Sequence, residues 1–375
     1  MASTPHADNR PQLQPTVLVV PLDEARLAVH RGTRQSDPSL IVDDRDGRKR
    51  AALELCTGEH SIGEIAAALN GNGYAVSVDE LAGFLDSMRA SKVLADAPAF
   101  SKGTLTEPQR ERYSRNLNGF AVLADDDETS GGLQQRLFDG HVLMLGAGGL
   151  GSLTSLALAM AGCGKISVID FDTVELSNLN RQAYTVADVG STKVDALRAR
   201  VATANPEVVV NTVARRLNGP ADVRNALADS RPDIVVAAID RPTIAADRWI
   251  SDACFEAGVP AVFNSVSAGK GLLWSKVPGA TGCFQCDELW AAQNNPEHFQ
   301  VRRYREEHDL IPATSASSYS AMTVAGFVAS DIIRHLLGRP MASAGKLAVI
   351  DFATLAVNVQ DKPAHADCKI CQPTR

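Results

Sequence analysis

The chain lacks several features that would assign it to a specialised class of protein. No apolar run reaches the ~18 residues that a membrane-spanning helix needs, and the polar opening residues MASTPHADNRPQLQP contain no apolar core of a signal peptide. There are no internal repeats, and there is no excess of positive charge, because 37 Lys and Arg face 44 Asp and Glu. We therefore expect a globular, cytoplasmic protein that binds neither nucleic acid nor membrane. Its 375 residues allow two or three domains.

The N-terminal part predicts a disordered tail over residues 1–14 and a small α+β domain over residues 15–100. Strands are expected at 17–20, 26–30 and 40–42, helices at 48–55, 62–69 and 78–90, and a short wing strand at 92–94. Ser61 with Glu64 and Ser77 with Glu80 have the spacing of capping boxes. This order is typical of a winged helix. DNA is an unlikely ligand, because residues 1–100 hold ten Lys and Arg against fourteen Asp and Glu and offer no basic helix face.

The stretch from His141 to Asp172 predicts a strand, a glycine turn, a helix and a second strand that ends in an acid. The turn contains four glycines, Gly146, Gly148, Gly149 and Gly151. A bend after a strand favours glycine where a pyrophosphate must approach the backbone, and the next helix points its positive end at that phosphate. Asp170 follows at the distance of an acid that holds ribose hydroxyls. The stretch therefore predicts a nucleotide site, and the glycines alone are compatible with a nicotinamide oxidoreductase.

Strands and helices alternate after Asp172, with strands expected at 208–213, 234–238 and 261–263. Such alternation predicts a mostly parallel, doubly wound α/β sheet of Rossmann type. Polar and charged residues gather where its strands end, namely Asn178, Arg181, Lys193 and Asp240. A nucleotidyl transfer needs fixed cations and a metal ion near the α-phosphate and the leaving pyrophosphate, whereas a nicotinamide enzyme does not. For each arginine or lysine taken alone, a solvated surface charge is the alternative.

Five motifs occur in order: RYSRN at 112–116, GAGGLG at 146–151, DFDTVELSNLNRQ at 170–182, GSTKV at 190–194 and the strand-end Asp240. Over residues 107–375 the chain thereby resembles the ThiF/MoeB superfamily, which is related to ubiquitin-activating enzymes. Within it, a PG-x-TGC-x-x-C stretch at 278–286 and a Pro312-Ala313-Thr314 turn resemble the MccB-type peptide adenylyltransferases. The segments LELCTGEHSIGEIAAAL and VDELAGFLDSM resemble PqqD-like domains, which bind leader peptides of ribosomally made natural products. A structural or dimerising domain is the alternative.

The resemblance implies a role for each matching residue in binding ATP. Gly146, Gly148, Gly149 and Gly151 would line the phosphates and Asp170 would hold the ribose. Asn178, Arg181 and Lys193 would contact phosphates, and Asp240 would bind Mg²⁺ and help to place the substrate carboxylate. Arg115 would reach the γ-phosphate of the neighbouring subunit's ATP, so that a homodimer would be the catalytic unit.

Two CxxC pairs, Cys283 with Cys286 and Cys368 with Cys371, lie 81 residues apart. Four thiolates in two such pairs suit a tetrahedral, structural Zn²⁺. No cysteine lies between Asp287 and Asp367, so a thioester step is not expected. The segment 294–309 is read as a mobile loop, in which Arg302, Arg303 and Arg305 either grip a peptide carboxylate or are simply solvated. The remaining cysteines, Cys56, Cys163 and Cys254, are expected to be buried packing residues.

These observations predict ATP-dependent adenylation of the C-terminal carboxylate of a ribosomally made precursor peptide. Two alternatives remain. One is the activation of a ubiquitin-like sulfur-carrier protein, and the other is a non-catalytic module that delivers a leader peptide to a partner enzyme.

Overall fold

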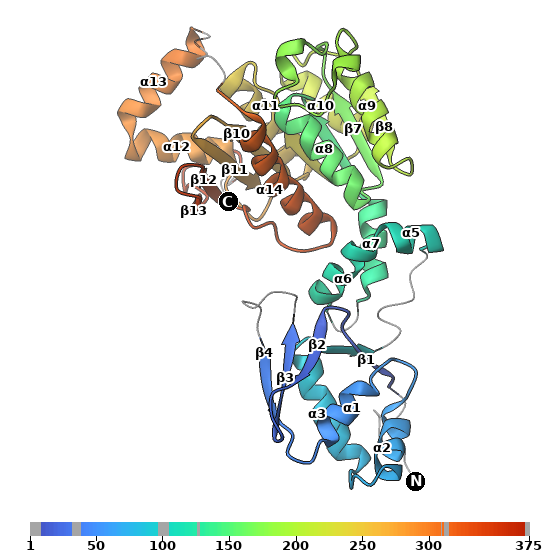
Figure 1. The fold of residues 1–375 in the computed structure, drawn as a ribbon. Helices are drawn as coiled ribbons and strands as arrows, with labels where there is room; N and C mark the ends of the chain where they lie inside the picture. Colours follow the sequence, from blue (N-terminus) through green and yellow to red (C-terminus); the bar gives the residue numbers. More distant parts are fainter. Residues whose placement is uncertain are drawn as a thin grey trace. The chain divides into compact units, whose positions relative to one another are not determined.

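The computed structural model describes residues 9–31, 39–96, 105–125, 128–308, 310 and 315–371. The chain divides into two compact units, Met1–Gln135 and Arg136–Arg375 (Figure 1). The first unit therefore extends beyond residue 100, where the sequence placed the domain boundary. Hydrogen bonds explain the difference: Gln14 Nε2 donates to the carbonyl of Ala121 at 3.2 Å, and Lys92 Nζ donates to the carbonyl of Ala124 at 2.7 Å. These bonds attach the segment around residue 121 to the small domain.

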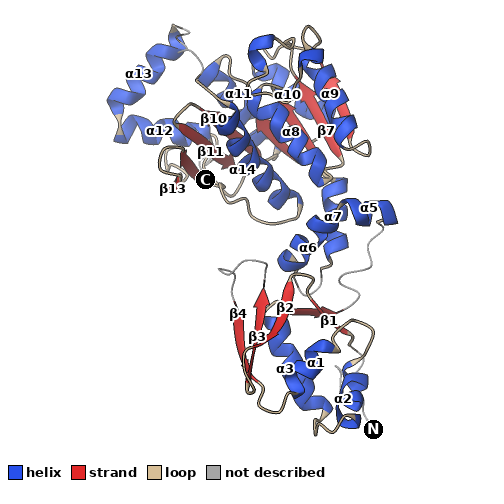
Figure 2. Cartoon of the chain, in the orientation of Figure 1, coloured by secondary structure: helices blue, strands red, loops and turns tan. Residues whose placement is uncertain are grey.

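The N-terminal unit contains an antiparallel sheet in the order β2-β3-β4 together with three helices (Figure 2). Its elements are β2 (Val17–Pro21), β3 (Arg26–Arg31), β4 (Ser39–Asp43), α1 (Arg48–Glu54), α2 (Ile62–Gly71) and α3 (Val78–Ala90). The side chains of Leu27, Val29, Leu53, Ile65 and Leu85 form the centre of its core. The order of elements agrees with the sequence prediction, and the winged-helix assignment itself stays a prediction.

The two predicted capping boxes have different outcomes. Ser61 and Glu64 form both reciprocal hydrogen bonds at the start of α2, which confirms the first box. At α3 the Ser77 hydroxyl accepts from the Glu80 backbone N–H, while the Glu80 carboxylate instead pairs with Arg48 at 2.8 Å. Helix α3 therefore has the Ser77 N-cap hydrogen bond and lacks the reciprocal bond of a capping box.

The N-terminal tail is shorter than predicted. Residues Pro11–Leu13 form strand β1, which pairs antiparallel with β5 (Leu94–Asp96). On its other side, Leu13 donates to the Cys56 carbonyl, and Pro11 accepts from Gly58. The polar, proline-containing sequence predicts disorder, because the partners of this strand are distant in the sequence. Residues 1–8 lie outside the described residues.

Three helices complete this part of the chain: α5 (Glu107–Arg112), α6 (Ser114–Leu123) and α7 (Ser130–Asp139). Thr106 caps α5 in a capping box with Gln109, and a proline follows in the first turn. Helix α7 continues across the boundary between the two units.

The C-terminal unit is built on an eight-stranded sheet in the order β13-β12-β11-β10-β9-β6-β7-β8. The strands are β6 (His141–Leu145), β7 (Lys165–Ile169), β8 (Val209–Val213), β9 (Ile234–Ala237), β10 (Ala261–Val266), β11 (Lys270–Lys276), β12 (Lys346–Asp351) and β13 (Ala356–Asp361). Strands β10, β9, β6, β7 and β8 are parallel, as predicted, and β11 to β13 continue the sheet antiparallel. The sheet is thus a mixed one, and its antiparallel extension was not predicted.

Helices cover both faces of this sheet (Figure 1). They are α8 (Gly149–Ala161), α9 (Lys193–Ala204), α10 (Pro220–Ser230), α11 (Thr243–Ala257), α12 (Phe284–Asn294), α13 (Pro296–Glu307) and α14 (Ser318–Leu336). Leu143 and Leu145 of β6 pack with α10 and α11 in one core cluster. Because side chains alternate along a strand, Val142 and Met144 face the opposite side. Helix α14 packs against α8, β10 and β11.

The segment 294–309 corrects another prediction. Residues Pro296–Glu307 form helix α13 rather than a loop. Arg248 of α11 holds this helix, because its guanidinium donates to Glu306 of α13 at 2.8 Å and to Glu288 of α12 at 2.7 Å. A segment so rich in charge has no apolar periodicity, and its helix depends on such ion pairs. The predicted turn Pro312-Ala313-Thr314 lies outside the described residues.

None of the described helices is long and apolar enough to cross a membrane.

Candidate active site and metal centre

The glycine turn lies where β6 ends and α8 begins. Gly146 has a φ of +102°, a backbone conformation that favours glycine, and a Cβ there would lie 2.4 Å from the Ala238 carbonyl oxygen. A Cβ on Gly151 would lie 2.0 Å from the carbonyl oxygen of Gly146. Gly148 differs, because no atom that is counted among the described residues lies within 4 Å of its Cβ position. The turn thus packs tightly against β9 and α8 and leaves open space at Gly148, in front of the N-terminus of the helix.

The turn also marks the point where the strand order reverses. Strand β6 lies between β7 and β9 in the sheet. From β6 the chain continues to β7 on one side, and from β9 it continues to β10 on the other side. In open α/β sheets, ligands bind in the crevice at this point, beyond the carboxyl ends of the strands. Asp170 follows β7 at this edge: its Oδ2 accepts from Ala147 N at 2.6 Å and its Oδ1 from Asp172 N at 2.8 Å. Asp170 therefore fixes the shape of the glycine turn.

Arg181 lies against the start of α8. A Cβ on Gly149 would lie 3.7 Å from Arg181 Cγ, and the guanidinium donates to the Ser177 carbonyl and to Asn180 Oδ1, both at 2.9 Å. Asn178 is buried and lies in the short 3₁₀ helix η1 (Leu176–Asn178), where its Oδ1 accepts from Glu175 N. The structure thus brings Arg181 to the glycine turn, and gives Asn178 a structural hydrogen bond.

Lys193 is a buried cation at the start of α9, with 7% of its surface exposed. Its Nζ donates to Asp172 Oδ2 at 2.7 Å, and its backbone N–H donates to the Asp172 carbonyl. The phenol of Tyr184 donates to the carbonyls of Ala147 and Lys193, which ties the glycine turn to α9. Burial raises the pKa of Tyr184 well above its usual range, so the phenol stays a donor. The sequence motifs did not indicate these roles of Asp172 and Tyr184. For Asp172, the sequence signal was the pattern Asp170-Phe171-Asp172 after β7, which places a second carboxylate at the same edge of the sheet as Asp170.

Asp240 and Arg115 complete the predicted set. Asp240 is exposed three residues after β9, on the segment whose Ala238 contacts Gly146. It therefore lies at the same edge as the glycine turn. Arg115 is exposed on α6, which belongs to the N-terminal unit.

Two buried acceptors at this edge have no hydrogen-bond partner within the described part of the chain. They are Gln182 Oε1, next to Arg181, and Asn264 Oδ1, whose amide nitrogen donates to the carbonyl of Ala237 at the end of β9. Neither oxygen is reached by solvent in this structure. The open space at Gly148, the helix N-terminus and the two cations Arg181 and Lys193 suit a ligand with phosphates. The edge therefore has the features that a nucleotide site requires.

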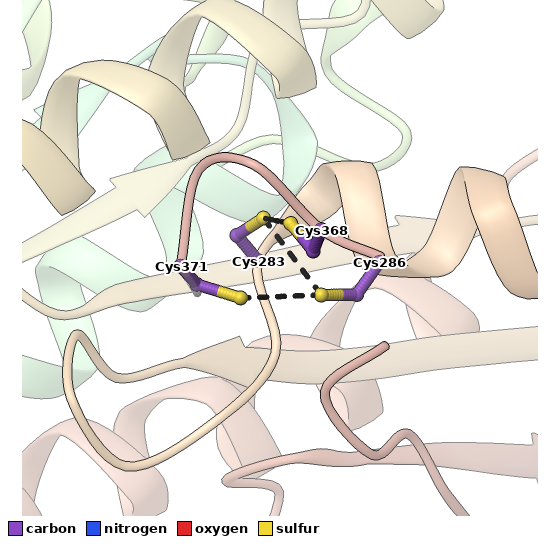
Figure 3. A group of neighbouring side chains, drawn as sticks. All are labelled: Cys283, Cys286, Cys368 and Cys371. Atoms are coloured by element: carbon purple, nitrogen blue, oxygen red, sulfur yellow. Dashed lines mark hydrogen bonds between the residues drawn. The ribbon is translucent and has the colours of Figure 1, made fainter. Parts of the chain in front are cut away.

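The four predicted metal ligands lie together at the start of α12 and near the C-terminal end (Figure 3). Their sulfur atoms all lie within 4.8 Å of one another, with Cys283 and Cys368 3.4 Å apart and Cys286 and Cys371 3.3 Å apart. Four sulfurs at ~2.3 Å from one Zn²⁺ would be separated by about 3.8 Å. The cluster could therefore hold a tetrahedral metal ion with little rearrangement.

The thiols differ in acidity. Burial raises the pKa of Cys283 above its usual range and that of Cys286 to about 11. At Cys368 burial acts in the same direction, but hydrogen bonds from the backbone of Cys371 and Ile370 and with the Cys283 and Cys286 thiols together lower the pKa. A bound cation would favour the thiolate at all four. Cys56, Cys163 and Cys254 are buried elsewhere, and burial raises the pKa of each to about 12, which confirms them as packing residues.

Known proteins resemble this chain in sequence. A family model described as the ThiF family matches residues 113–370. The sulfur carrier protein ThiS adenylyltransferase of Escherichia coli is 36% identical over 188 residues, which are 50% of this chain and 69% of the relative. The molybdopterin-synthase adenylyltransferase of Escherichia coli is 28% identical over 270 residues, which are 71% of this chain and 98% of the relative.

Solved structures resemble the chain in fold. Crystal structures of E. coli MccB, one of them with AMPCPP and MccA, superpose with a TM-score of 0.75 at 20% identity and cover 96% of this chain and 99% of MccB. PaaA superposes with a TM-score of 0.70 at 22% identity and covers 92% and 98% of the two chains. The fold that this chain shares with MccB thus includes most of the N-terminal unit. The match over residues 113–370, on a sheet edge suited to a nucleotide, shows that the chain belongs to the ThiF family and is an adenylyltransferase.

Proposed function

We propose that this enzyme uses ATP to adenylate the C-terminal carboxylate of a ribosomally made precursor peptide, in the biosynthesis of an antibiotic-type natural product. The observation that carries the proposal is the combination of two units in one chain: a ThiF-type nucleotide edge and an N-terminal unit whose fold is shared with MccB over almost the whole length. The ThiF family model matches residues 113–370, so most of the N-terminal unit lies outside that match. This part of the chain is therefore available to bind the peptide.

In this proposal the chemistry relies on positioning and charge. A carboxylate oxygen of the peptide attacks the α-phosphorus of ATP, the bond from that phosphorus to the bridging oxygen breaks, and pyrophosphate leaves. Arg181 and Lys193 hold the phosphates, and the glycine turn keeps the triphosphate still. Lys193 is already oriented by Asp172, so little reorganisation is needed when the nucleotide binds. No side chain forms a covalent bond to the substrate.

Metal ions have two roles in the proposal. Mg²⁺, held by Asp240, would neutralise charge that develops on the phosphates. Asp240 suits this role because it is exposed at the carboxyl edge of the sheet. Zn²⁺ at the four cysteines would be structural, because four thiolates leave no open position. It would join the segment around Cys368 to the start of α12.

The N-terminal unit offers a surface for the peptide. Strand β4 is an edge of the three-stranded sheet, and the outer face of that sheet carries apolar side chains that solvent reaches. Leu18 is 56% exposed and Ile41 58% exposed. An extended peptide can add as a strand to such an edge, with backbone hydrogen bonds and apolar contacts. This supports the PqqD-like, winged-helix reading of the unit.

A homodimer would complete the site, with Arg115 acting on the ATP of the neighbouring subunit. The exposed position of Arg115 on α6 is compatible with that role. Helix α14 is compatible with the dimer, because Tyr319 and Met322 lie one turn apart on it and are 52% and 59% exposed.

The test is ATP–pyrophosphate exchange with candidate precursor peptides, followed by the same measurement on Asp240→Ala. Exchange that depends on a peptide and is lost in Asp240→Ala supports the proposal. Exchange with a small protein ending in Gly-Gly, and with no peptide, would contradict it. For recognition, Leu18→Asp with Ile41→Asp should weaken peptide binding and leave ATP binding unchanged, whereas Leu355→Asp, at a residue 87% exposed in the other unit, should affect neither.

Activation of a ubiquitin-like sulfur-carrier protein is the second candidate. The identity with the ThiS and molybdopterin-synthase adenylyltransferases favours it. The N-terminal unit and the absence of cysteine between residues 287 and 367 favour the peptide instead. A non-catalytic delivery module is the third, and the retention of Asp170, Arg181 and Lys193 argues against it.

A further inference from the structure

Two segments that lie far apart in the sequence bring the four cysteines together (Figure 3). The first pair, Cys283 and Cys286, belongs to the start of α12, and the second pair, Cys368 and Cys371, follows after 81 residues. Closing such a loop costs conformational entropy. The apparent affinity for a metal ion falls as fewer chains have the site assembled before the ion arrives. Contacts of the protein that hold the two pairs in register therefore strengthen metal binding.

Two contacts anchor the C-terminal segment upstream of the second pair. Trp290 Nε1 donates to the carbonyl of Pro363 at 3.0 Å, and the Trp290 ring meets His365 edge to face, with ring centroids 4.8 Å apart. A Cβ on Gly282 would lie 3.0 Å from Ala364 Cα, so the two backbones approach closely just before the first pair. These contacts bring the segment to α12, and a further contact orients the second pair itself.

Gln285 makes that contact. It lies between the two cysteines of the first pair, and its Oε1 accepts from the Lys369 backbone N–H at 3.2 Å and from Cys368 Sγ at 3.3 Å. The bond from sulfur needs a thiol proton, which a metal-bound sulfur lacks, whereas the bond from the backbone N–H does not. A metal-bound thiolate shares its charge with the cation, which limits its repulsion of the Gln285 oxygen. The bond to Lys369 can therefore persist in the metal-bound protein.

We propose that Gln285 is a positioning residue for the metal centre: its side-chain carbonyl holds the Lys369 backbone, and thereby the turn of the second pair, in register with the first pair. Each of the two residues is the direct neighbour of a ligand in the sequence, so this one bond sets how the pairs face each other. Partners of metal ligands outside the coordination sphere typically contribute about ten- to a hundredfold in metal affinity. Lys369 is exposed, so water can replace the lost acceptor, and the contribution here is about tenfold or less.

The test is a titration of the full chain with Co²⁺, whose absorption reports thiolate ligands, followed by competition with Zn²⁺. Gln285→Leu keeps most of the side-chain volume and removes the acceptor. It should raise the dissociation constant of the metal about three- to tenfold. The spectrum at saturation should stay that of the wild type, because all four cysteines remain. Gln293→Leu is the matched control on the same helix: this residue is exposed, and its substitution should leave the affinity unchanged.

Lys369→Pro tests the same bond from its other side, because proline has no backbone N–H. It should weaken metal binding by a similar factor, and Gln285→Leu should then have no further effect in that background. Unchanged affinity in Gln285→Leu, tighter binding in that variant, or additive effects of the two substitutions would each overturn the proposal. A wild-type chain that binds no Co²⁺ would refute the metal centre and this inference together. The titration needs neither ATP nor peptide, so its result is independent of the proposed function.

Discussion

Alanine at two glycines of the same turn should differ in its effect on folding stability. At Gly151 a Cβ would lie 2.0 Å from the Gly146 carbonyl oxygen, whereas ordinary contact begins near 3.4 Å. Helix and turn must therefore separate by about 1.4 Å, and overpacking of this kind costs about 1–3 kcal/mol of folding stability. At Gly148 the described part of the chain leaves the space within 4 Å of the Cβ open, so Gly148→Ala should cost the folded protein no more than about 1 kcal/mol at this N-cap.

Nucleotide use, unlike stability, should suffer from both substitutions. The open space at Gly148 lies before the N-terminus of α8, where a phosphate would sit. A methyl group there should raise the dissociation constant of ATP at least about tenfold, a change of ~1.4 kcal/mol. Gly151→Ala also disturbs the turn, and a displacement near 1 Å costs roughly 10²-fold in rate. Gly148→Ala should therefore weaken ATP binding while the folding stability of the protein changes little.

Both effects can be measured on the full chain. All three tryptophans, Trp249, Trp274 and Trp290, belong to the C-terminal unit, so their fluorescence in a denaturant titration reports the unfolding of that unit. Calorimetric titration with Mg-ATP, without peptide, gives the affinity. A Gly151→Ala protein as stable as the wild type would refute the packing argument. A Gly148→Ala protein that binds ATP with wild-type affinity would refute the position of the phosphate.

Three further predictions concern charged groups. Lys193→Met should lower kcat/KM of the adenylation by about 10²–10³. It should change the free energy of unfolding by only about 1 kcal/mol, because the side chain of its partner Asp172 is 44% exposed. A loss of activity no larger than that of Asp172→Asn would contradict the prediction. Cys283→Ser should reduce metal content, measured by atomic emission, from about one ion per chain, and a metal-free wild-type protein with native stability would exclude the site. Burial raises the pKa of Asp247 to about 7, against the opposing effect of Arg302. Because the folded state then holds the proton more tightly, stability should fall as pH rises from 4 to 7, and Asp247→Asn should lose this dependence in urea titrations.

Local patterns in the sequence were sufficient for much of the fold. The strand before Gly146, the helix after it and Asp170 follow from hydrophobic runs and turn chemistry that extend over few residues. The parallel half of the sheet follows from alternation, because a parallel pair needs a crossover helix. Predictions failed where order depends on distant partners: Pro11–Leu13 became a strand by pairing with Leu94–Asp96, and Pro296–Glu307 became a helix that Arg248 holds.

The candidate site divides in the same way. The sequence by itself determined the residue types, because glycines, Asp170, Arg181, Lys193 and paired cysteines have motif spacings that carry chemical meaning. Only the tertiary structure decided which partner each residue has. It joined Lys193 to Asp172 and the glycine turn to Tyr184, and it buried one side-chain oxygen each of Gln182 and Gln14 without a hydrogen-bond partner among the described residues. The physical reason is that composition and spacing specify which groups are available, whereas burial and hydrogen bonding depend on segments that meet only when the chain folds.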